Sequence, residues 1–237
     1  MTLGAVIFDF DGVLADSEPL HLAAFQEVLT TIGITLTGDE YYAQYLGYSD
    51  RDAFLHVCRD RGVVLGAARL DALMATKQDV FPQLVGEHGL FPGAAACLDR
   101  IAAEVPIAIA SGALRHEIEL MLDRGGLAGR VPIIVAAGET PRSKPAPDPY
   151  ARAFDLLVAD GYLSSDTTRA QVVAIEDSEW GLQSARGAGL RTIGVTTSYT
   201  ADRLPSADVT VPGIDAVTIP ALRALVAGHL SHATPRV

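Results

Sequence analysis

Short runs of apolar residues, many of them β-branched, recur along the chain, and between them lie stretches in which apolar residues return every three or four positions. The runs are typical of buried strands, and the intervening stretches are typical of amphipathic helices. Six strands are predicted, at residues 3–8, 106–110, 132–136, 171–175, 191–195 and 208–211. Because helical stretches separate the strands, we expect an α/β fold with a parallel sheet.

The segment at residues 17–87 interrupts this alternation. It contains no clear buried strand, but apolar residues recur with helical spacing at residues 21–31, 52–61 and 67–84. We therefore predict two domains. Residues 1–16 and 88–237 are expected to form an α/β core, and residues 17–87 a helical insertion after the first strand.

Composition and charge narrow the classes of function. Hydrophobic residues make up 49% of the 237-residue chain and charged residues 20%, as in packed globular proteins rather than disordered ones. The net charge is −11 and there is no basic stripe, so we expect no nucleic-acid partner. An anionic substrate would need local positive charge from a metal ion, a lysine or a helix N-terminus.

Two further observations concern where the protein works. No apolar run approaches the ~18 residues of a membrane span, and the N-terminus lacks the pattern of a signal peptide. Cys58 and Cys97 lie far apart without CxxC spacing, which is typical of reduced thiols. We expect a cytoplasmic protein with no membrane partner.

The first predicted strand ends in two aspartates, Asp9 and Asp11, followed by Gly12. A spacing of two puts both side chains on one side of an extended chain, at the strand end where open parallel sheets bind ligands. Two carboxylates this close repel unless a cation neutralises them or one holds a proton. One could serve as nucleophile or metal ligand and the other as acid/base, while a solvated turn is the structural alternative.

Three further polar groups follow later predicted strands. Ser111, before Gly112, combines a hydroxyl with exposed N–H groups at a helix start, and such groups bind anions. Lys144 lies in a loop stiffened by three prolines and offers positive charge. Glu176 and Asp177 offer the hard oxygen ligands that Mg²⁺ prefers. Taken singly, these groups could be a helix cap, a solvated lysine and a surface acidic pair.

In this order, each at a strand end, the groups resemble the four motifs of the haloacid dehalogenase superfamily. The resemblance covers essentially the whole chain, through Asp9-Phe10-Asp11-Gly12, Ser111, Lys144 and Glu176-Asp177. These motifs look most like the branch of β-phosphoglucomutase and sugar-phosphate phosphatases. The resemblance implies a Rossmann-like parallel-sheet core with an inserted all-helical cap domain. Members that cleave carbon–halogen bonds lack the second aspartate, so Asp11 implies phosphoryl transfer.

The resemblance also implies roles for the motif residues. Asp9 would be the nucleophile and Asp11 its acid/base partner. Mg²⁺ would be the cofactor, held by the Asp9 carboxylate, the Asp11 backbone carbonyl and Asp177, with Glu176 assisting. The groups expected to hold the phosphoryl oxygens or the rest of the substrate are Ser111, Lys144, Gly112, Ala113 and Arg115.

Inside the helical insertion, the resemblance implies four substrate-binding residues: His21, Gly47, Arg51 and Lys77. Here the match is looser. The mutase's loop arginine would align with Asp50, one position before Arg51, and this disfavours a mutase. Packing at a hinge is the structural alternative for His21, and a solvated helix position is the alternative for Lys77.

Together these expectations define a Mg²⁺-dependent phosphatase that hydrolyses a small phosphorylated metabolite, such as a sugar phosphate, through a phospho-aspartate. A hexose-phosphate mutase of the β-phosphoglucomutase type is the main alternative, because it shares every core residue and differs in using a sugar hydroxyl as acceptor. A receiver-like signalling domain also surrounds a phospho-aspartate with such groups, but it would not need the insertion. No sequence patch indicates a stable interface, so we expect a monomer or a weak dimer.

Overall fold

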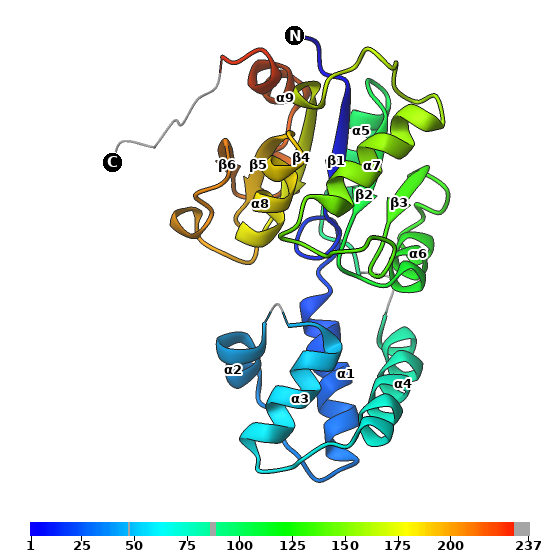
Figure 1. Ribbon diagram of the computed structural model, residues 1–237, viewed down its shortest axis with the longest axis vertical. Helices are drawn as coiled ribbons and strands as arrows, with labels where there is room; N and C mark the ends of the chain where they lie inside the picture. The colour runs from blue at the N-terminus through cyan, green and yellow to red at the C-terminus, as the bar shows by residue number, and fades with distance from the viewer. Residues whose placement is uncertain (47, 86–88, 230–237) are drawn as a thin grey trace. The chain divides into compact units, whose positions relative to one another are not determined.

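The computed structural model describes residues 1–46, 48–85 and 89–229 of the chain (Figure 1). The chain divides into two compact units, one made of Met1–Asp16 and His88–Val237 and the other of Ser17–Glu87. None of the described helices is both long and apolar enough to cross a membrane.

A parallel sheet of six strands forms the centre of the first unit. The strands are β1 (Ala5–Phe8), β2 (Ile107–Ala110), β3 (Ile133–Val135), β4 (Val172–Glu176), β5 (Arg191–Val195) and β6 (Val209–Val211). They lie in the order β3-β2-β1-β4-β5-β6, and every neighbouring pair is parallel. The strands match the six predicted runs to within a residue or two, so the predicted α/β fold is confirmed.

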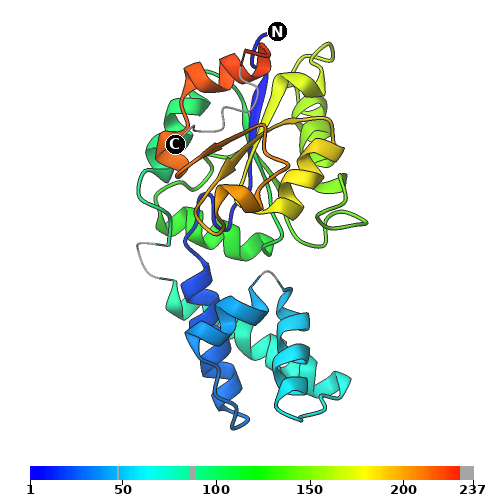
Figure 2. The same cartoon turned by 90° about the vertical axis from the view of Figure 1, so that its left-hand side faces the viewer.

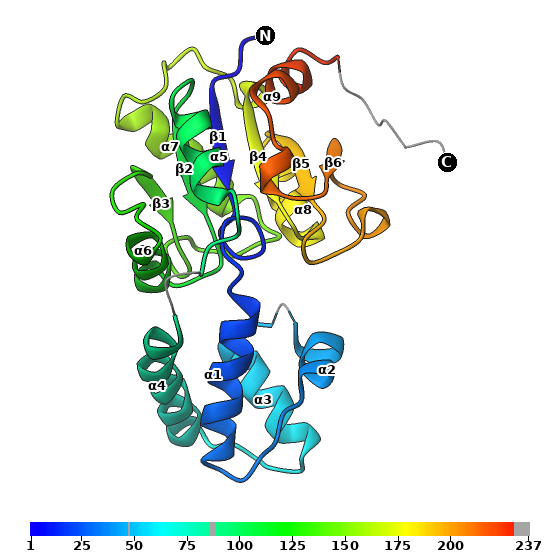
Figure 3. The same ribbon diagram turned by 180° about the vertical axis from the view of Figure 1, so that it is seen from behind.

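Helices cover both faces of this sheet (Figure 2). They are α5 (Ala94–Ala102), α6 (Arg115–Arg124), α7 (Asp148–Ala159), α8 (Glu179–Gly187) and α9 (Ile219–Val226), with short 3₁₀ turns η2 (Arg169–Gln171), η3 (Ala201–Arg203) and η4 (Ile214–Ala216). Side chains of α7 and α8, among them Tyr150, Leu157 and Ala185, pack against one face of the strands. Helices α5 and α9 lie on the opposite face (Figure 3). A sheet covered on both faces explains why its strands are continuous apolar runs.

The central strand, β1, lies between β2 and β4. Its last residue, Phe8, is in register with Ile109 of β2 and with Ile175 of β4. Because the strands are parallel, the residues that follow these three positions emerge at the same edge of the sheet. The strand order also reverses direction here, since β2 and β3 lie on one side of β1 and β4 to β6 on the other. Open α/β sheets bind ligands at such a point.

The second unit is helical throughout its described residues. It contains α1 (Glu18–Thr30), α2 (Gly38–Glu40), the π-helical turn η1 (Tyr41–Tyr45), α3 (Asp50–Asp60) and α4 (Ala67–Leu84). Three of these correspond to the predicted helices, but α1 begins earlier than expected because Pro19 fits its first turn. The helices pack around aromatic side chains, including Phe25 and Phe54, whose ring centroids lie 4.9 Å apart.

Candidate active site

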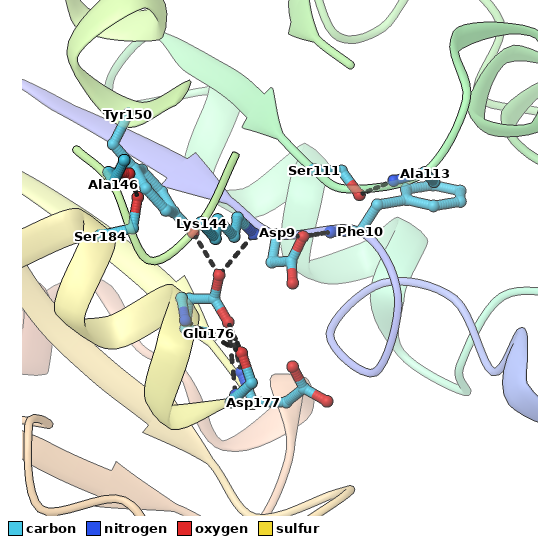
Figure 4. A network of polar contacts seen from close by, with 12 residues as sticks. Asp9, Phe10, Ser111, Ala113, Lys144, Ala146, Tyr150, Glu176, Asp177 and Ser184 are labelled. Carbon is cyan, nitrogen blue, oxygen red and sulfur yellow. Dashed lines mark hydrogen bonds and ion pairs between the residues drawn. The ribbon is translucent and has the colours of Figure 1, made fainter. Parts of the chain in front are cut away.

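Three carboxylates meet where β1 and β4 end. Asp9 directly follows β1, Glu176 is the last residue of β4, and Asp177 comes next. The Asp9 N–H donates to the carbonyl of Ile175 at 2.9 Å, which continues the pairing of the two strands past Phe8. One carboxylate oxygen from each acid lies within 4.8 Å of the others, and all three residues are buried (Figure 4).

Lys144 joins two of these acids. Its Nζ lies 2.8 Å from Asp9 Oδ1 and 2.6 Å from Glu176 Oε1. The lysine comes from the segment between β3 and α7, so a third part of the sequence reaches the same edge of the sheet. Tyr150, in the first turn of α7, donates from its hydroxyl to Glu176 Oε1 at 2.8 Å, and its ring centroid lies 5.2 Å from the ammonium. Figure 4 shows this group converging on Glu176.

The remaining oxygen of Glu176 is held by the start of α8. Glu176 Oε2 accepts hydrogen bonds from the N–H of Asp177 at 3.2 Å and from the hydroxyl of Ser178 at 3.0 Å. Gly181 in the same turn packs directly against this carboxylate, because a Cβ there would lie 1.8 Å from Glu176 Oε1. Glu176 therefore links Lys144 to the N-terminal turn of α8, and it does so with both of its oxygens.

Burial and repulsion between the carboxylates raise the pKa values of Asp9 and Asp177. Desolvation, then the charge of Glu176, raises the pKa of Asp9 to about 7, although Lys144 opposes the shift and the charge of Asp11 adds to it. The pKa of Asp177 is raised well above its usual range, first by burial and then by the charges of Glu176 and Asp9. Burial alone would lower the pKa of Lys144, but its two carboxylate partners outweigh burial and raise it.

These charges fit a divalent cation. Three buried carboxylates face one ammonium, so the ionised cluster holds more negative than positive charge in a poorly solvated place. A hard cation that binds oxygen ligands and tolerates a few carboxylates, as Mg²⁺ does, would neutralise the excess. The donor set at the end of β1 and β4 therefore suits the predicted metal.

Asp9 and Asp11 lie on a tight turn after β1. Asp9 Oδ1 accepts from the N–H of Phe10 at 2.7 Å, and the Asp11 backbone bridges to Ala15. Gly12 follows with a φ of +72°, a conformation that glycine adopts readily. The turn holds Asp11 near enough to Asp9 for its charge to affect the Asp9 pKa.

Ser111 follows β2 at the same edge of the sheet. Its N–H donates to the carbonyl of Val135 at 2.9 Å, and its buried hydroxyl accepts from the N–H of Ala113 at 3.0 Å (Figure 4). The Ala113 N–H is thus directed at Ser111, whereas Gly112 between them is exposed. The structure brings Ser111, Gly112 and Ala113 to the strand end where the sequence predicts an anion site.

Arg115, predicted as a substrate contact, forms hydrogen bonds with other residues of the protein. Its guanidinium donates to both carboxylate oxygens of Glu139, at 2.6 and 2.9 Å, and to the carbonyl of Ile134 at 2.7 Å. Glu119, one turn further along α6, lies 3.3 Å from the same group. These bonds tie α6 to β3 and the segment after it, and they give no support to a substrate role.

In the helical unit, two predicted residues come together. Lys77 is almost fully buried, and its Nζ lies 3.0 Å from His21 Nδ1 and 2.6 Å from Asp50 Oδ1. The His21 ring stacks on Phe81, and burial followed by the charge of Lys77 lowers the pKa of His21 to about 3. The lysine is therefore not a solvated helix residue.

Among the described residues, the remaining predicted contact of this unit, Arg51, does not join that cluster. Arg51 is exposed and lies 3.5 Å from Asp71. Gly47 falls outside the described residues. The four substrate contacts expected in this unit stay predictions.

Sequence reasoning missed Tyr150, Ser178 and Ser198. Ser198 follows β5 and donates to Asp177 Oδ2 at 2.5 Å, so its position after a strand was a signal that could have found it. Ser178 sits at the N-cap of α8, where serine is common for structural reasons. Tyr150 lies inside an amphipathic helix and had no such signal, because its contact with Glu176 depends on how α7 packs.

Comparison with known proteins assigns the family. Residues 6–195 match the model of a family described as haloacid dehalogenase-like hydrolases. The match covers well over half of the chain, and the chain therefore belongs to the haloacid dehalogenase-like hydrolases.

Individual relatives indicate which members of this family the chain resembles. Protein CbbY of Rhodobacter capsulatus is 31% identical over 231 residues, covering 94% of this chain and 98% of that protein. Fructose-1-phosphate phosphatase YqaB of Escherichia coli is 28% identical over 204 residues, covering 80% and 95%. A crystal structure of mutant CbbY from Rhodobacter sphaeroides with xylulose 1,5-bisphosphate covers 94% of this chain and 99% of that one, with a TM-score of 0.77 and 24% identity. The predicted family, fold and enzyme class are confirmed.

The raised pKa of Asp9 predicts that acid weakens metal binding. Below pH 7 this carboxyl is increasingly protonated, and it must lose the proton before it can bind a cation. Lowering the pH from about 8 to about 6 should therefore weaken Mg²⁺ binding about tenfold or more, measured by isothermal titration calorimetry. The Asp9→Asn variant should show a smaller dependence, and equal affinity of the wild-type protein at both pH values would contradict the prediction.

Tyr150→Phe should destabilise the protein by about 1–3 kcal/mol, because the buried Glu176 carboxylate loses a donor while the ring keeps its packing. Urea denaturation with a spectroscopic readout measures the change. Tyr162→Phe is the matched control, since Tyr162 is 46% exposed, and it should cost less than about 0.5 kcal/mol. Equal stability of the two variants would show that the Tyr150 hydroxyl does not support Glu176.

Proposed function

We propose that this protein is a Mg²⁺-dependent phosphatase that hydrolyses a small sugar phosphate through a phospho-aspartate formed on Asp9. The observation that supports it most is the buried cluster of Asp9, Glu176 and Asp177, bridged by Lys144. Phosphoryl transfer requires a nucleophile, positive charge beside it and ligands for a metal ion. The cluster offers a carboxylate, a lysine ammonium and further carboxylates at one edge of the sheet.

Asp9 would attack the phosphorus. Its Oδ1 accepts from the Phe10 N–H and lies 2.8 Å from Lys144 Nζ, and these two contacts fix the rotation of the carboxylate. A nucleophile held in one orientation meets its target with less loss of freedom than a mobile one. Asp9 would thus form a bond to phosphorus as the bond from phosphorus to the sugar oxygen breaks.

Asp11 would move the protons. In the first step it would give a proton to the departing sugar oxygen, and in the second it would take a proton from the water that attacks the phospho-aspartate. That water releases inorganic phosphate and restores the Asp9 carboxylate. The turn after β1 places the two aspartates close together, with Asp11 affecting the Asp9 pKa, and this supports paired roles.

Asp9, Asp177 and the backbone carbonyl of Asp11 would hold Mg²⁺, with Glu176 assisting. When bound, the cation would neutralise negative charge on the transferred phosphoryl group. Lys144 and Ser111 would bind phosphoryl oxygens, since both lie at the edge of the sheet that carries Asp9. Fixed positive charge and fixed donors stabilise the charge that develops on those oxygens.

The substrate class follows from the relatives rather than from the core residues. One relative is a fructose-1-phosphate phosphatase, and CbbY has been crystallised with xylulose 1,5-bisphosphate. We infer a phosphorylated sugar on this ground. We also propose that the helical unit, residues 17–87, is the cap that excludes water and selects the substrate, while the remainder is the catalytic core.

Asp9→Asn should reduce phosphate release from fructose 1-phosphate or xylulose 1,5-bisphosphate at least about a thousandfold, because an amide cannot serve as the nucleophile. Asp123→Asn, which changes an exposed aspartate on α6, should keep the wild-type rate. The measurement is steady-state release of inorganic phosphate from a panel of sugar phosphates with added Mg²⁺. Retained turnover in Asp9→Asn would rule out the proposed mechanism.

A second assay on the same purified protein distinguishes hydrolase activity from mutase activity. Incubation with β-glucose 1-phosphate and a hexose bisphosphate activator should yield inorganic phosphate or no reaction. Accumulation of glucose 6-phosphate instead would identify a sugar hydroxyl as the acceptor and favour the mutase.

A further inference from the structure

The loop that follows β5 contacts the active-site edge at two places. The N–H of Thr196 donates to β6 at 3.0 Å, which fixes the start of the loop to the sheet. The next two side chains are directed at the site: the Thr197 hydroxyl donates to the Gly12 carbonyl, and the Ser198 hydroxyl donates to Asp177 Oδ2 at 2.5 Å. Consecutive hydroxyls of one loop therefore hold the turn after β1 and the acid after β4.

Gly12, Asp177 and Ser198 pack so closely that a larger residue at position 12 would not fit. A Cβ on Gly12 would lie 1.9 Å from Asp177 Oδ2 and 2.9 Å from Ser198 Oγ. The turn after β1, the Asp177 carboxylate and the Ser198 hydroxyl are thus packed in direct contact. Movement of Ser198 would free the Asp177 carboxylate, whereas Thr197 would still hold the Gly12 carbonyl.

Ser198 is suited to orient Asp177. A hydroxyl donates one proton, and a carboxylate oxygen has two lone pairs, so Oδ2 can accept from Ser198 and still keep a lone pair for another ligand. The serine nearest in sequence, Ser178, donates to Glu176 rather than to Asp177. Within the described residues, Ser198 is the side chain that restrains the rotation of Asp177 by a hydrogen bond.

We propose that Ser198 is a positioning residue for the metal, which sets the orientation of the Asp177 carboxylate before the cation binds. The inference rests on the proposed function, because it assumes that Asp177 is a metal ligand. Groups that orient a ligand in this way typically change metal affinity by about 10- to 100-fold when they are removed. The alternative is that the hydroxyl only satisfies a buried carboxylate and contributes to stability alone.

Metal binding by the full-length protein distinguishes the two roles. In calorimetric titrations with Mg²⁺, Ser198→Ala should raise the Kd about tenfold or more, and Ser198→Thr, which keeps the hydroxyl, should restore most of the affinity. Thr196→Val is the matched control, since it removes a hydroxyl of the same loop that bonds to β6 rather than to the acids. Its Kd should match that of the wild-type protein.

A wild-type Kd in Ser198→Ala, together with a lower unfolding free energy of the metal-free variant, would overturn the inference and assign the hydroxyl a structural role. If Ser198→Ala does not fold, Ser198→Cys keeps nearly the same shape with a weaker donor. It should raise the Kd several-fold, and an unchanged Kd would again overturn the inference. Absence of Mg²⁺ binding by the wild-type protein would overturn the proposed metal dependence as well.

Discussion

The ion pairs of Lys144 are the interaction on which the active-site edge depends. Three carboxylates are buried together, and without a cation their repulsion and desolvation would favour protonation or separation. Lys144 contacts both Asp9 and Glu176, and this holds together the carboxylates at the ends of β1 and β4. One ammonium does not balance three ionised carboxylates, so the acids that Lys144 holds together keep an excess of negative charge that suits a cation.

The layer of helices on one face of the sheet supports that lysine. Tyr150 projects from α7 beneath the ammonium and donates to Glu176, while Ser184 of α8 donates to the Ala146 carbonyl at 2.5 Å and anchors the lysine's loop (Figure 4). Both helices also bury apolar side chains against the strands. Packing of the core and placement of the charges are therefore achieved by the same two helices, and a change that shifts either helix will move the charges as well.

Local sequence patterns were sufficient to predict the sheet and most of its reactive edge. Asp9, Ser111 and Glu176 each follow or end an apolar run, and in a parallel sheet that position alone brings them to a common edge. Lys144 follows β3 at a greater distance, and its prediction needed the motif resemblance in addition. The short helical turns at residues 38–45 were missed because their pattern is too brief for helical periodicity to register.

Contacts that depend on packing could not be predicted in this way. Arg115 lies close to Ser111 in sequence, yet Glu139 binds its guanidinium, and nothing local distinguishes that pairing from a phosphate contact. Lys77 was predicted to bind substrate, which stays a prediction, and its partnership with Asp50 arises from the packing of α3 against α4. Tyr150 and Ser198 reach the acids only once the complete sheet has placed α7 against its strands and β5 beside β4.

The insertion of residues 17–87 directly after the first strand has a consequence for how the protein is made. Asp9 is synthesised early, but the strands on either side of it, β2 and β4, come roughly a hundred residues or more later. Until β4 is complete, β1 lacks one of its two neighbours and Asp9 lacks Glu176 and Asp177. The buried cluster at the sheet edge can therefore come together only after Asp177 has been synthesised, although Asp9 is among the first residues made.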